Sequence, residues 1–161
     1  MLRVAGIEKE SIVDCHGLRY VIFTQGCHNV HTWDKNVGYD VKVEDLFEDI
    51  KKTPLLRGVT FSGGEPFEQA FELSYLAGYI KKWNPNLDII AYTGYKVEEL
   101  IEKSYENIPI RRLLCGVDII VDGGYIEEEK DVNLKFRGGK NQRIINMKQS
   151  LDLGYIVESV M

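Results

Sequence analysis

The chain has 161 residues, a net charge of −5 and 44% hydrophobic residues. These values suit one globular domain, 1–161, and the acidic balance gives no support to a nucleic-acid partner. No apolar run reaches the roughly 18 residues that a membrane span needs, and charges interrupt the N-terminal segment too early for a signal peptide. Three cysteines do not form a disulfide framework, so we expect reduced thiols or metal ligands in a cytoplasmic protein.

Four short apolar segments rich in Val and Ile are expected to form buried strands. Each segment is a continuous apolar run rather than an alternating one, as is typical of strands covered on both faces. In chain order the four segments are 18–24, 58–62, 87–93 and 117–122.

Three segments between these strands have apolar residues at every third or fourth position and are expected to be helices. The three segments are 43–52, 66–83 and 96–106. In the second, Pro66 suits a first helical turn and Pro85 follows the end of the helix. The apolar positions of this helix are Phe67, Ala70, Phe71, Leu73 and Tyr75 through Ile80.

This alternation of strands and helices predicts an α/β protein with a mostly parallel sheet. Four strands are too few for a full eight-stranded barrel, which leaves a partial barrel or an open sheet. In such sheets the site forms at the carboxyl ends of the strands. Gly-rich or polar residues follow all four expected strands, at 25–29, 62–66, 93–95 and 122–125. Their recurrence indicates a ligand surface, although each segment by itself is also an ordinary turn.

The segment 62–66, "SGGEP", has two glycines that let the backbone approach a ligand closely. Glu65 then stands at a helix start, where the helix dipole favours negative charge, or its carboxylate receives a cationic amine. The alternative is a plain strand-to-helix turn. A phosphate loop is excluded, because no Lys-Ser/Thr pair follows the glycines.

All three histidines and two of the three cysteines fall between residues 15 and 31, and these residue types are ligands of zinc and iron–sulfur sites. Their spacing does not match a zinc ribbon or finger. The five residues are Cys15, His16, Cys27, His28 and His31. Cys115 follows an apolar helix end and is expected to be a core cysteine.

The segment 134–145, "LKFRGGKNQRII", is basic and Gly-rich in an otherwise acidic chain. It indicates an anion site or a partner surface, or else a solvated loop before a last strand. Its charged residues are Lys135, Arg137, Lys140 and Arg143.

Several motifs together resemble one family, the activating proteins of anaerobic ribonucleoside-triphosphate reductases, which belong to the radical S-adenosylmethionine enzymes. The motifs are "GIEKESIVD", "GLRYVIFTQGC", "HNVHTWD", "VTFSGGEPFEQA", "AYTGY", "VDIIVDG" and "LKFRGGKNQRII". They occur in family order and cover the chain from about residue 3 to residue 150.

The resemblance implies a partial (βα) barrel in which three cysteines of one loop bind a 4Fe-4S cluster. The fourth iron of that cluster is chelated by S-adenosylmethionine. One electron then cleaves this cofactor to methionine and a 5′-deoxyadenosyl radical, which takes a hydrogen atom from a glycine of the large reductase subunit. The implied partners are that subunit and an electron donor such as a flavodoxin or ferredoxin.

The resemblance also assigns site residues in this chain. Cys27 is the implied cluster ligand. The residues before it match those before the family's first cluster cysteine and the residues after it match those after the last, so Cys27 corresponds either to the first or to the third. Ser62 to Glu65 match the motif for the methionine amino group, and two further segments match the walls of the same pocket. The implied cofactor-binding residues are His28, Asn29, Ser62, Gly63, Gly64, Glu65, Tyr92, Thr93 and Asp122.

The chain departs from the family in the cluster loop. The family reads Thr-Gln-Gly-Cys-x-x-x-Cys-x-x-Cys-His-Asn, whereas here Cys27 runs directly into His28 and Asn29. About seven residues and two of the three thiolates that a cluster with one open iron requires are therefore missing. Cys15 precedes the strand 18–24 and Cys27 follows it, so an extended strand separates them by about 30 Å, too far to share a cluster.

Three interpretations follow from this departure. Either the chain has lost its cluster and its radical chemistry, or it keeps the fold to bind the reductase or a nucleoside-like ligand without catalysis, or an unusual Cys/His site holds a metal. The first two predict a protein without iron. The third predicts iron and visible absorption in the purified protein.

Overall fold

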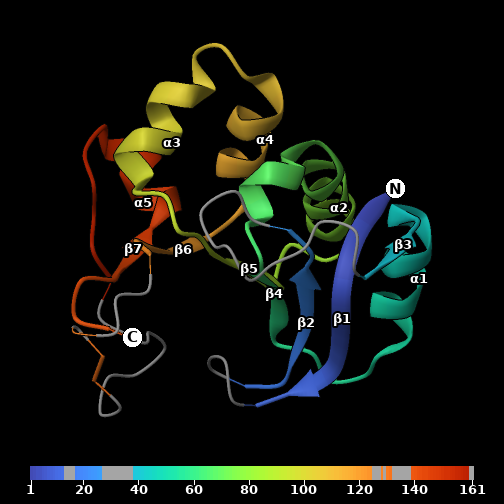
Figure 1. Ribbon diagram of the computed structural model, residues 1–161. Helices are drawn as coiled ribbons and strands as arrows, with labels where there is room; N and C mark the ends of the chain where they lie inside the picture. The colour runs from blue at the N-terminus through green and yellow to red at the C-terminus, as the bar shows by residue number, and fades with distance from the viewer. Residues whose placement is uncertain (13–16, 27–37, 125–127, 129, 132–138, 160–161) are drawn as a thin grey trace.

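The computed structural model describes residues 1–12, 17–26, 38–124, 128, 130–131 and 139–159 (Figure 1). The strands are β1 (Leu2–Ser11), β2 (Arg19–Thr24), β3 (Tyr39–Val41), β4 (Gly58–Gly63), β5 (Asp88–Tyr92), β6 (Ile119–Asp122) and β7 (Arg143–Asn146). The helices are α1 (Val43–Lys52), the 3-10 helix η1 (Pro66–Gln69), α2 (Ala70–Trp83), α3 (Val97–Ser104), α4 (Ile108–Gly116) and α5 (Met147–Leu153).

These strands form one mixed sheet in the order β3-β1-β2-β4-β5-β6-β7. The central neighbours β2, β4, β5 and β6 pair in parallel, which confirms the four strands and the parallel centre expected from the sequence. The outer strands β1, β3 and β7 pair antiparallel; β1 and β3 were not anticipated, and β7 corresponds to the last strand of one alternative for the segment 134–145. Among the described residues β3 and β7 are the two edges, so the sheet is open between them.

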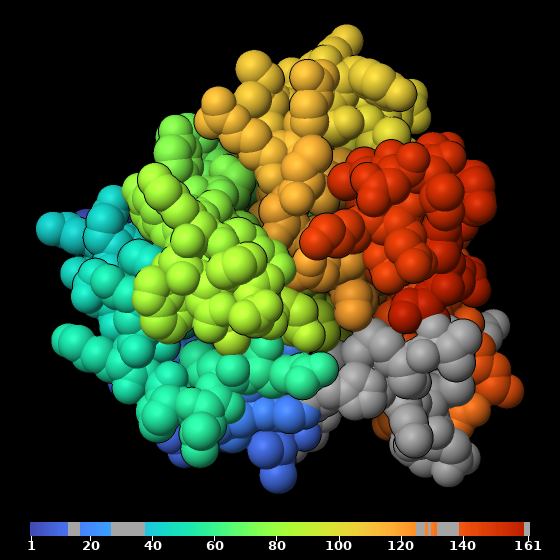
Figure 2. Space-filling view, turned by 180° about the vertical axis from the view of Figure 1, so that it is seen from behind, coloured from blue at the N-terminus to red at the C-terminus, as the bar shows by residue number. Residues whose placement is uncertain are grey.

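One face of the sheet carries the main core. Alternate residues of the strands, such as Tyr20, Phe61 and Ile89, are buried there against Leu73 and Leu76 of α2. Seen from behind, the helices cover this face, with α1 and α2 side by side (Figure 2). The intervening strand residues form a smaller cluster on the opposite face, which contains Ile90, Val121 and Ile144 with Tyr92 and Ile119 packed against them. The continuous apolar runs thus correspond to strands buried on both faces.

The amino ends of the parallel strands are fixed in register by a buried arginine. Arg19 begins β2, is 1% exposed, donates to Thr60 Oγ1 at 2.7 Å and pairs with Asp88. Gly58 stands between them in the register, and a Cβ there would lie 2.2 Å from Asp88 Oδ1.

The segment expected as one helix over 66–83 is divided. Residues 66–69 form the 3-10 helix η1, and Gln69 has a non-helical backbone (φ −118°, ψ 36°) before α2 begins. The reason is tertiary: the Gln69 amide accepts from Arg3 N–H and donates to Arg3 O, both at 2.7 Å, and so bonds to β1 as another strand would.

The expectation that Cys115 is a core cysteine is wrong. Cys115 is exposed. Leu113 and Leu114 lie on the side of α4 that faces the core, and the next residue, Cys115, points away from the core. Of the apolar residues that predicted α2, Ala70, Leu73, Leu76, Ala77 and Ile80 are buried, whereas Phe71 and Tyr75 are exposed. In the described part of the chain, no helix has the length and hydropathy to cross a bilayer.

Candidate functional site

The loops that follow β2 and β4 are bonded directly to each other. Gly64 N–H donates to Thr24 O at 2.8 Å and Glu65 N–H donates to Gly26 O at 3.0 Å. A Cβ on Gly64 would lie 2.3 Å from the Gly26 carbonyl oxygen, so only glycine permits this approach. Gly63 has φ +88°, which lets the chain turn from the strand into this contact. The two glycines are therefore required by the backbone geometry at this strand end.

Glu65 joins the loop after β4 to the loop after β5. Its side chain is 1% exposed and accepts from Thr93 Oγ1 at 2.8 Å, from Gly94 N–H at 2.8 Å and from Phe67 N–H at 3.1 Å. Burial raises the pKa of this carboxyl above its ordinary value, and the three hydrogen bonds offset part of that rise. Donors of the chain itself thus surround the carboxylate, and it holds two loops of the strand ends together.

The loop after β6 continues the same edge. Thr93 N–H donates to Val121 O and Gly123 N–H donates to Tyr95 O, both at 3.0 Å. Asp122 is 1% exposed and its carboxylate accepts from the N–H of Val97 at 2.8 Å, in the first turn of α3. An acceptor at a helix start satisfies an N–H that the helix leaves without a partner.

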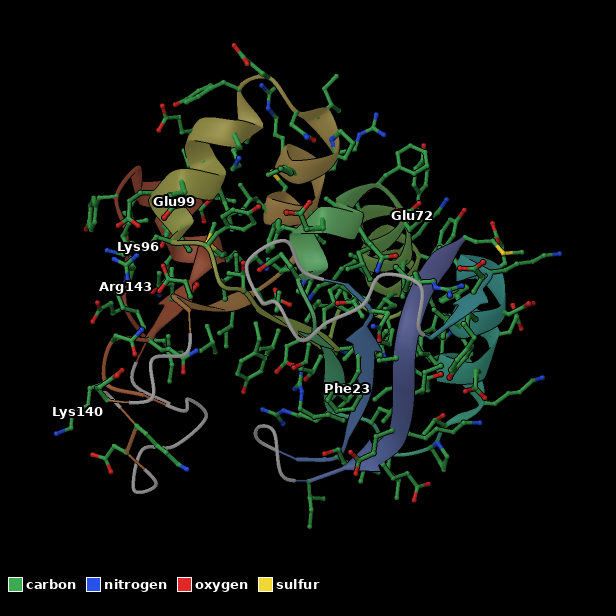
Figure 3. The ribbon with its side chains drawn as sticks, viewed as in Figure 1. Phe23, Glu72, Lys96, Glu99, Lys140 and Arg143 are labelled. Atoms are coloured by element: carbon green, nitrogen blue, oxygen red, sulfur yellow. The ribbon has the colours of Figure 1, made fainter. Side chains whose placement is uncertain are left out.

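Arg143 of β7 binds this buried aspartate from the neighbouring strand. It donates to both Asp122 oxygens, through Nε at 3.0 Å, and to both oxygens of Glu98 at 2.9 and 2.6 Å. Figure 3 shows Arg143 beside the start of α3, near Lys96 and Glu99. The hydrogen bonds from Arg143 lower the pKa of Glu98, and the two carboxylates raise the pKa of Arg143. One charge of the basic segment 134–145 is thus used within the fold.

Amide side chains of the same segment close the loop after β6. Asn141 Nδ2 donates to Gly124 O at 2.6 Å and Gln142 Nε2 donates to Gly123 O at 3.1 Å. Sequence reasoning considered only the charges of this segment and missed both amides, and nothing in the local sequence marks them. Lys140 is exposed, while Lys135 and Arg137 lie outside the described residues.

The structure brings most of the expected pocket residues to one edge of the sheet. Gly63, Gly64, Glu65 and Thr93 meet in the contacts above, with Ser62 at the end of β4. Tyr92 packs with the small cluster on the face away from the main core. Asp122 lies at the adjoining strand end, but its carboxylate faces Val97 and Arg143. The remaining expected residues, Cys15, His16, Cys27, His28, Asn29 and His31, lie outside the described residues.

The chain is similar to known proteins over most of its length. Residues 13–145 match the family model of a 4Fe-4S single cluster domain. The chain is 31% identical to an anaerobic ribonucleoside-triphosphate reductase-activating protein of Haemophilus influenzae, over 85% of this chain and 93% of that protein. Proteins of the same name from Vibrio cholerae and Enterobacteria phage T4 are 33% and 32% identical, over 83% and 80% of this chain and 90% and 83% of their own lengths.

The chain belongs to the family of anaerobic ribonucleoside-triphosphate reductase-activating proteins.

The cysteines of the chain do not match a cluster held by three thiolates of one loop. Between Gly26 and β3 the sequence contains a single cysteine, Cys27, whose chain neighbour Gly26 is fixed beside Glu65. Cys115 is exposed on α4, and among the described residues no group of three or more His, Cys, Asp or Glu is arranged to hold a metal. The structure thus describes the chain up to Gly26 at the carboxyl edge of the sheet, and the sequence that follows contains one cysteine before β3.

Proposed function

We propose that this protein acts in the activation of anaerobic ribonucleoside-triphosphate reductase, with the large reductase subunit as its partner. The support is the family relationship over 85% of the chain together with the intact pocket edge around Glu65. A partial (βα) barrel of the radical S-adenosylmethionine type is part of this proposal. The open sheet with a parallel centre is compatible with it.

The proposed ligand of the pocket edge is S-adenosylmethionine. Ser62, Gly63 and Gly64 lie at the end of β4, where the two glycines let the loops after β2 and β4 approach closely, and this strand end supports a site for the methionine part of that cofactor. Glu65 and Asp122 act as positioning residues, because each carboxylate is already bonded to donors of the neighbouring loops. Tyr92, Thr93, His28 and Asn29 complete the proposed pocket.

In this family's chemistry a 4Fe-4S cluster supplies one electron to the cofactor, delivered by a donor such as a flavodoxin or ferredoxin. Cys27 is the one proposed cluster ligand of the loop after β2. The other two thiolates are absent from that loop. We therefore expect this chain to bind the cofactor without forming the radical. It is expected to bind S-adenosylmethionine and the reductase, whereas formation of the glycyl radical requires a complete loop.

Calorimetry with S-adenosylmethionine and electron paramagnetic resonance with the reductase test the proposal. The chain as given is expected to bind the cofactor, and a variant with the seven-residue loop restored is expected to give a glycyl-radical signal with a reductant. Cofactor binding without any radical from the restored variant would favour the alternative, a non-catalytic homologue. Failure of both forms to bind S-adenosylmethionine would overturn the proposed pocket.

A further inference from the structure

The loop that contains Cys27 begins and ends on opposite sides of β1. This strand runs antiparallel to both of its neighbours, β2 and β3. Its residue Val4 pairs with Thr24, at the end of β2, and with Tyr39, at the start of β3. The amino end of β1 therefore lies between the two points at which the loop leaves and rejoins the sheet.

Arg3 of β1 contacts the chain on both sides of this loop. Its backbone oxygen accepts the Gln25 N–H at 3.0 Å, and its guanidinium pairs with Asp40 of β3 at 3.2 Å. Gly38, directly before β3, has φ +96°, and a Cβ there would lie 3.1 Å from Cβ of Gln25. The two ends of the loop are thus in close contact. We call Gln25, Gly26 and Gly38 the loop base.

The Gln69 side chain binds the loop base from η1. Its Oε1 accepts the Arg3 N–H at 2.7 Å, and its Nε2 donates to Arg3 O at 2.7 Å. The same Nε2 donates to Gln25 O at 3.4 Å. One amide therefore bonds to the start of β1 as a neighbouring strand would, and also to the residue two positions before Cys27.

The other end of η1 is the pocket edge around Glu65. The Glu65 carboxylate accepts the Phe67 N–H at 3.1 Å, and the Phe67 side chain is buried in the core. The Glu65 N–H donates to Gly26 O at 3.0 Å. Glu65 and Gln69 are thus the two ends of one short, anchored turn, and each of them bonds to the loop base.

The bonds of Gln69 affect position more than stability. They lie in a partly buried place, where water can take over the backbone groups of Arg3 if the amide is removed. Water molecules satisfy these groups but do not fix the separation between η1 and the loop base. Precise sites need such a supporting layer of hydrogen bonds behind the residues that contact the ligand.

We propose that Gln69 is a positioning residue that sets the place of the loop base relative to the pocket edge around Glu65. Cys27, His28 and Asn29 follow the loop base directly in the chain, so its place determines where these proposed contacts start. The expected effect on ligand binding rests on the proposed function, whereas the expected effect on the loop base does not.

Calorimetry with S-adenosylmethionine tests the effect on binding. Gln69→Leu removes the amide at similar volume and should raise the Kd about tenfold, as loss of a supporting hydrogen bond commonly does. Asn107→Ala is the matched control, because it removes the cap that accepts the Ile110 N–H at 3.0 Å at the distant start of α4. It should lower stability and leave the Kd unchanged. Both variants are measured where circular dichroism shows them folded.

Gln69→Glu tests the hydrogen bonds themselves. A protonated carboxyl offers one acceptor and one donor, as the amide does toward Arg3, whereas a carboxylate offers acceptors alone. Arg3 O and Gln25 O face this position and favour the protonated form. Relative to the natural chain at the same pH, Gln69→Glu should bind weakly at about pH 8 and recover at about pH 5, near the ordinary range of a Glu carboxyl. Gln69→Leu should stay weak at both.

Alkylation of the thiols tests the loop base without any ligand. Iodoacetamide labelling followed by mass spectrometry gives a separate rate for Cys27 and for Cys115, which is exposed on α4. In Gln69→Leu the rate at Cys27 should rise at least about threefold, because the base of its loop is released locally. The rate at Cys115 should stay the same in both proteins.

Three results would overturn the proposal. They are an equal Kd in the natural chain and Gln69→Leu, a Gln69→Glu variant that does not recover at low pH, and an unchanged rate at Cys27 in Gln69→Leu. Failure of the natural chain itself to bind S-adenosylmethionine would instead overturn the proposed pocket. The rate at Cys27 would then decide the role of Gln69 alone.

Discussion

Glu65 accepts a hydrogen bond from the Gly94 N–H at 2.8 Å, and these residues follow two neighbouring parallel strands. The bond crosses the carboxyl edge of the sheet and is supported by the Thr93 hydroxyl on the other carboxylate oxygen. These two hydrogen bonds join the "SGGE" and "YTGY" motifs into one structural unit, although Glu65 and Thr93 are 28 residues apart in the sequence.

Glu65→Gln should lower the free energy of unfolding by about 1–3 kcal/mol, because an amide –NH₂ group then faces a buried N–H donor. Gly94 and Phe67 both present such donors to the carboxylate. Urea unfolding followed by circular dichroism measures the change. Glu102→Gln, an exposed change on α3, is the control and should change the free energy by less than about 0.5 kcal/mol. Equal effects of the two substitutions would contradict the buried network.

The free energy of unfolding should depend on pH in part through the titration of Glu65. Because burial raises its pKa, the folded protein binds the proton more tightly than the unfolded chain does. Its contribution is therefore fully present below the unfolded pKa, about 4.3, and is lost as the pH rises through the raised folded pKa. The free energy of unfolding of the natural chain minus that of Glu65→Gln should fall over this window. A difference that rises with pH would show that the pKa is lowered instead.

Gly64→Ala should separate the loops after β2 and β4. Its Cβ would lie 2.3 Å from the Gly26 oxygen, so the backbone must move, at a cost of about 1–3 kcal/mol. Under the proposed function the same change should weaken binding of S-adenosylmethionine in calorimetry. Gly78→Ala is the matched control, since it enters open space in a helix and should stabilise the protein by about 0.5–1 kcal/mol. Loss of stability in both variants, or in neither, would refute this account of the contact.

Arg143→Met should destabilise the protein by about 3 kcal/mol, because it leaves the buried Asp122 carboxylate without its cation. Glu98→Gln removes the partner whose side chain is 53% exposed, and it should cost less than about 1 kcal/mol. Thermal and urea unfolding of both variants give the comparison. A larger loss of unfolding free energy in Glu98→Gln than in Arg143→Met would contradict the view that the main role of Arg143 is to neutralise Asp122.

Restoring the seven-residue loop, with its two cysteines, between Cys27 and His28 should restore binding of iron. Anaerobic reconstitution is expected to give about four irons and four sulfides per restored chain, with absorption near about 400 nm. The chain as given should bind much less. The same insertion with both cysteines replaced by serine separates thiolate ligation from loop length. A restored chain that takes up no iron would show that the gap is not what limits the cluster.

The elements at the centre of the fold follow from local patterns in the sequence. Helix α1 has the predicted bounds, because its apolar spacing is undisturbed by neighbouring elements. β1 was missed, because Glu8, Lys9 and Glu10 interrupt its apolar pattern and those residues are exposed in the structure. The break before α2 was missed as well, since it depends on the bonds between Gln69 and Arg3, 66 residues apart.

The sequence by itself determined the parallel centre of the sheet, the family and the shortened cluster loop. Each of these features can be recognised from apolar periodicity or from the order of short motifs, because both are local properties of the sequence. Tertiary structure alone decided that Glu65 bonds to Thr93 and Gly94, that Arg143 neutralises Asp122, and that Phe71 and Trp83 of α2 stay exposed. These outcomes depend on which side of each element meets another, and hydrogen bonds and packing between distant segments set that choice.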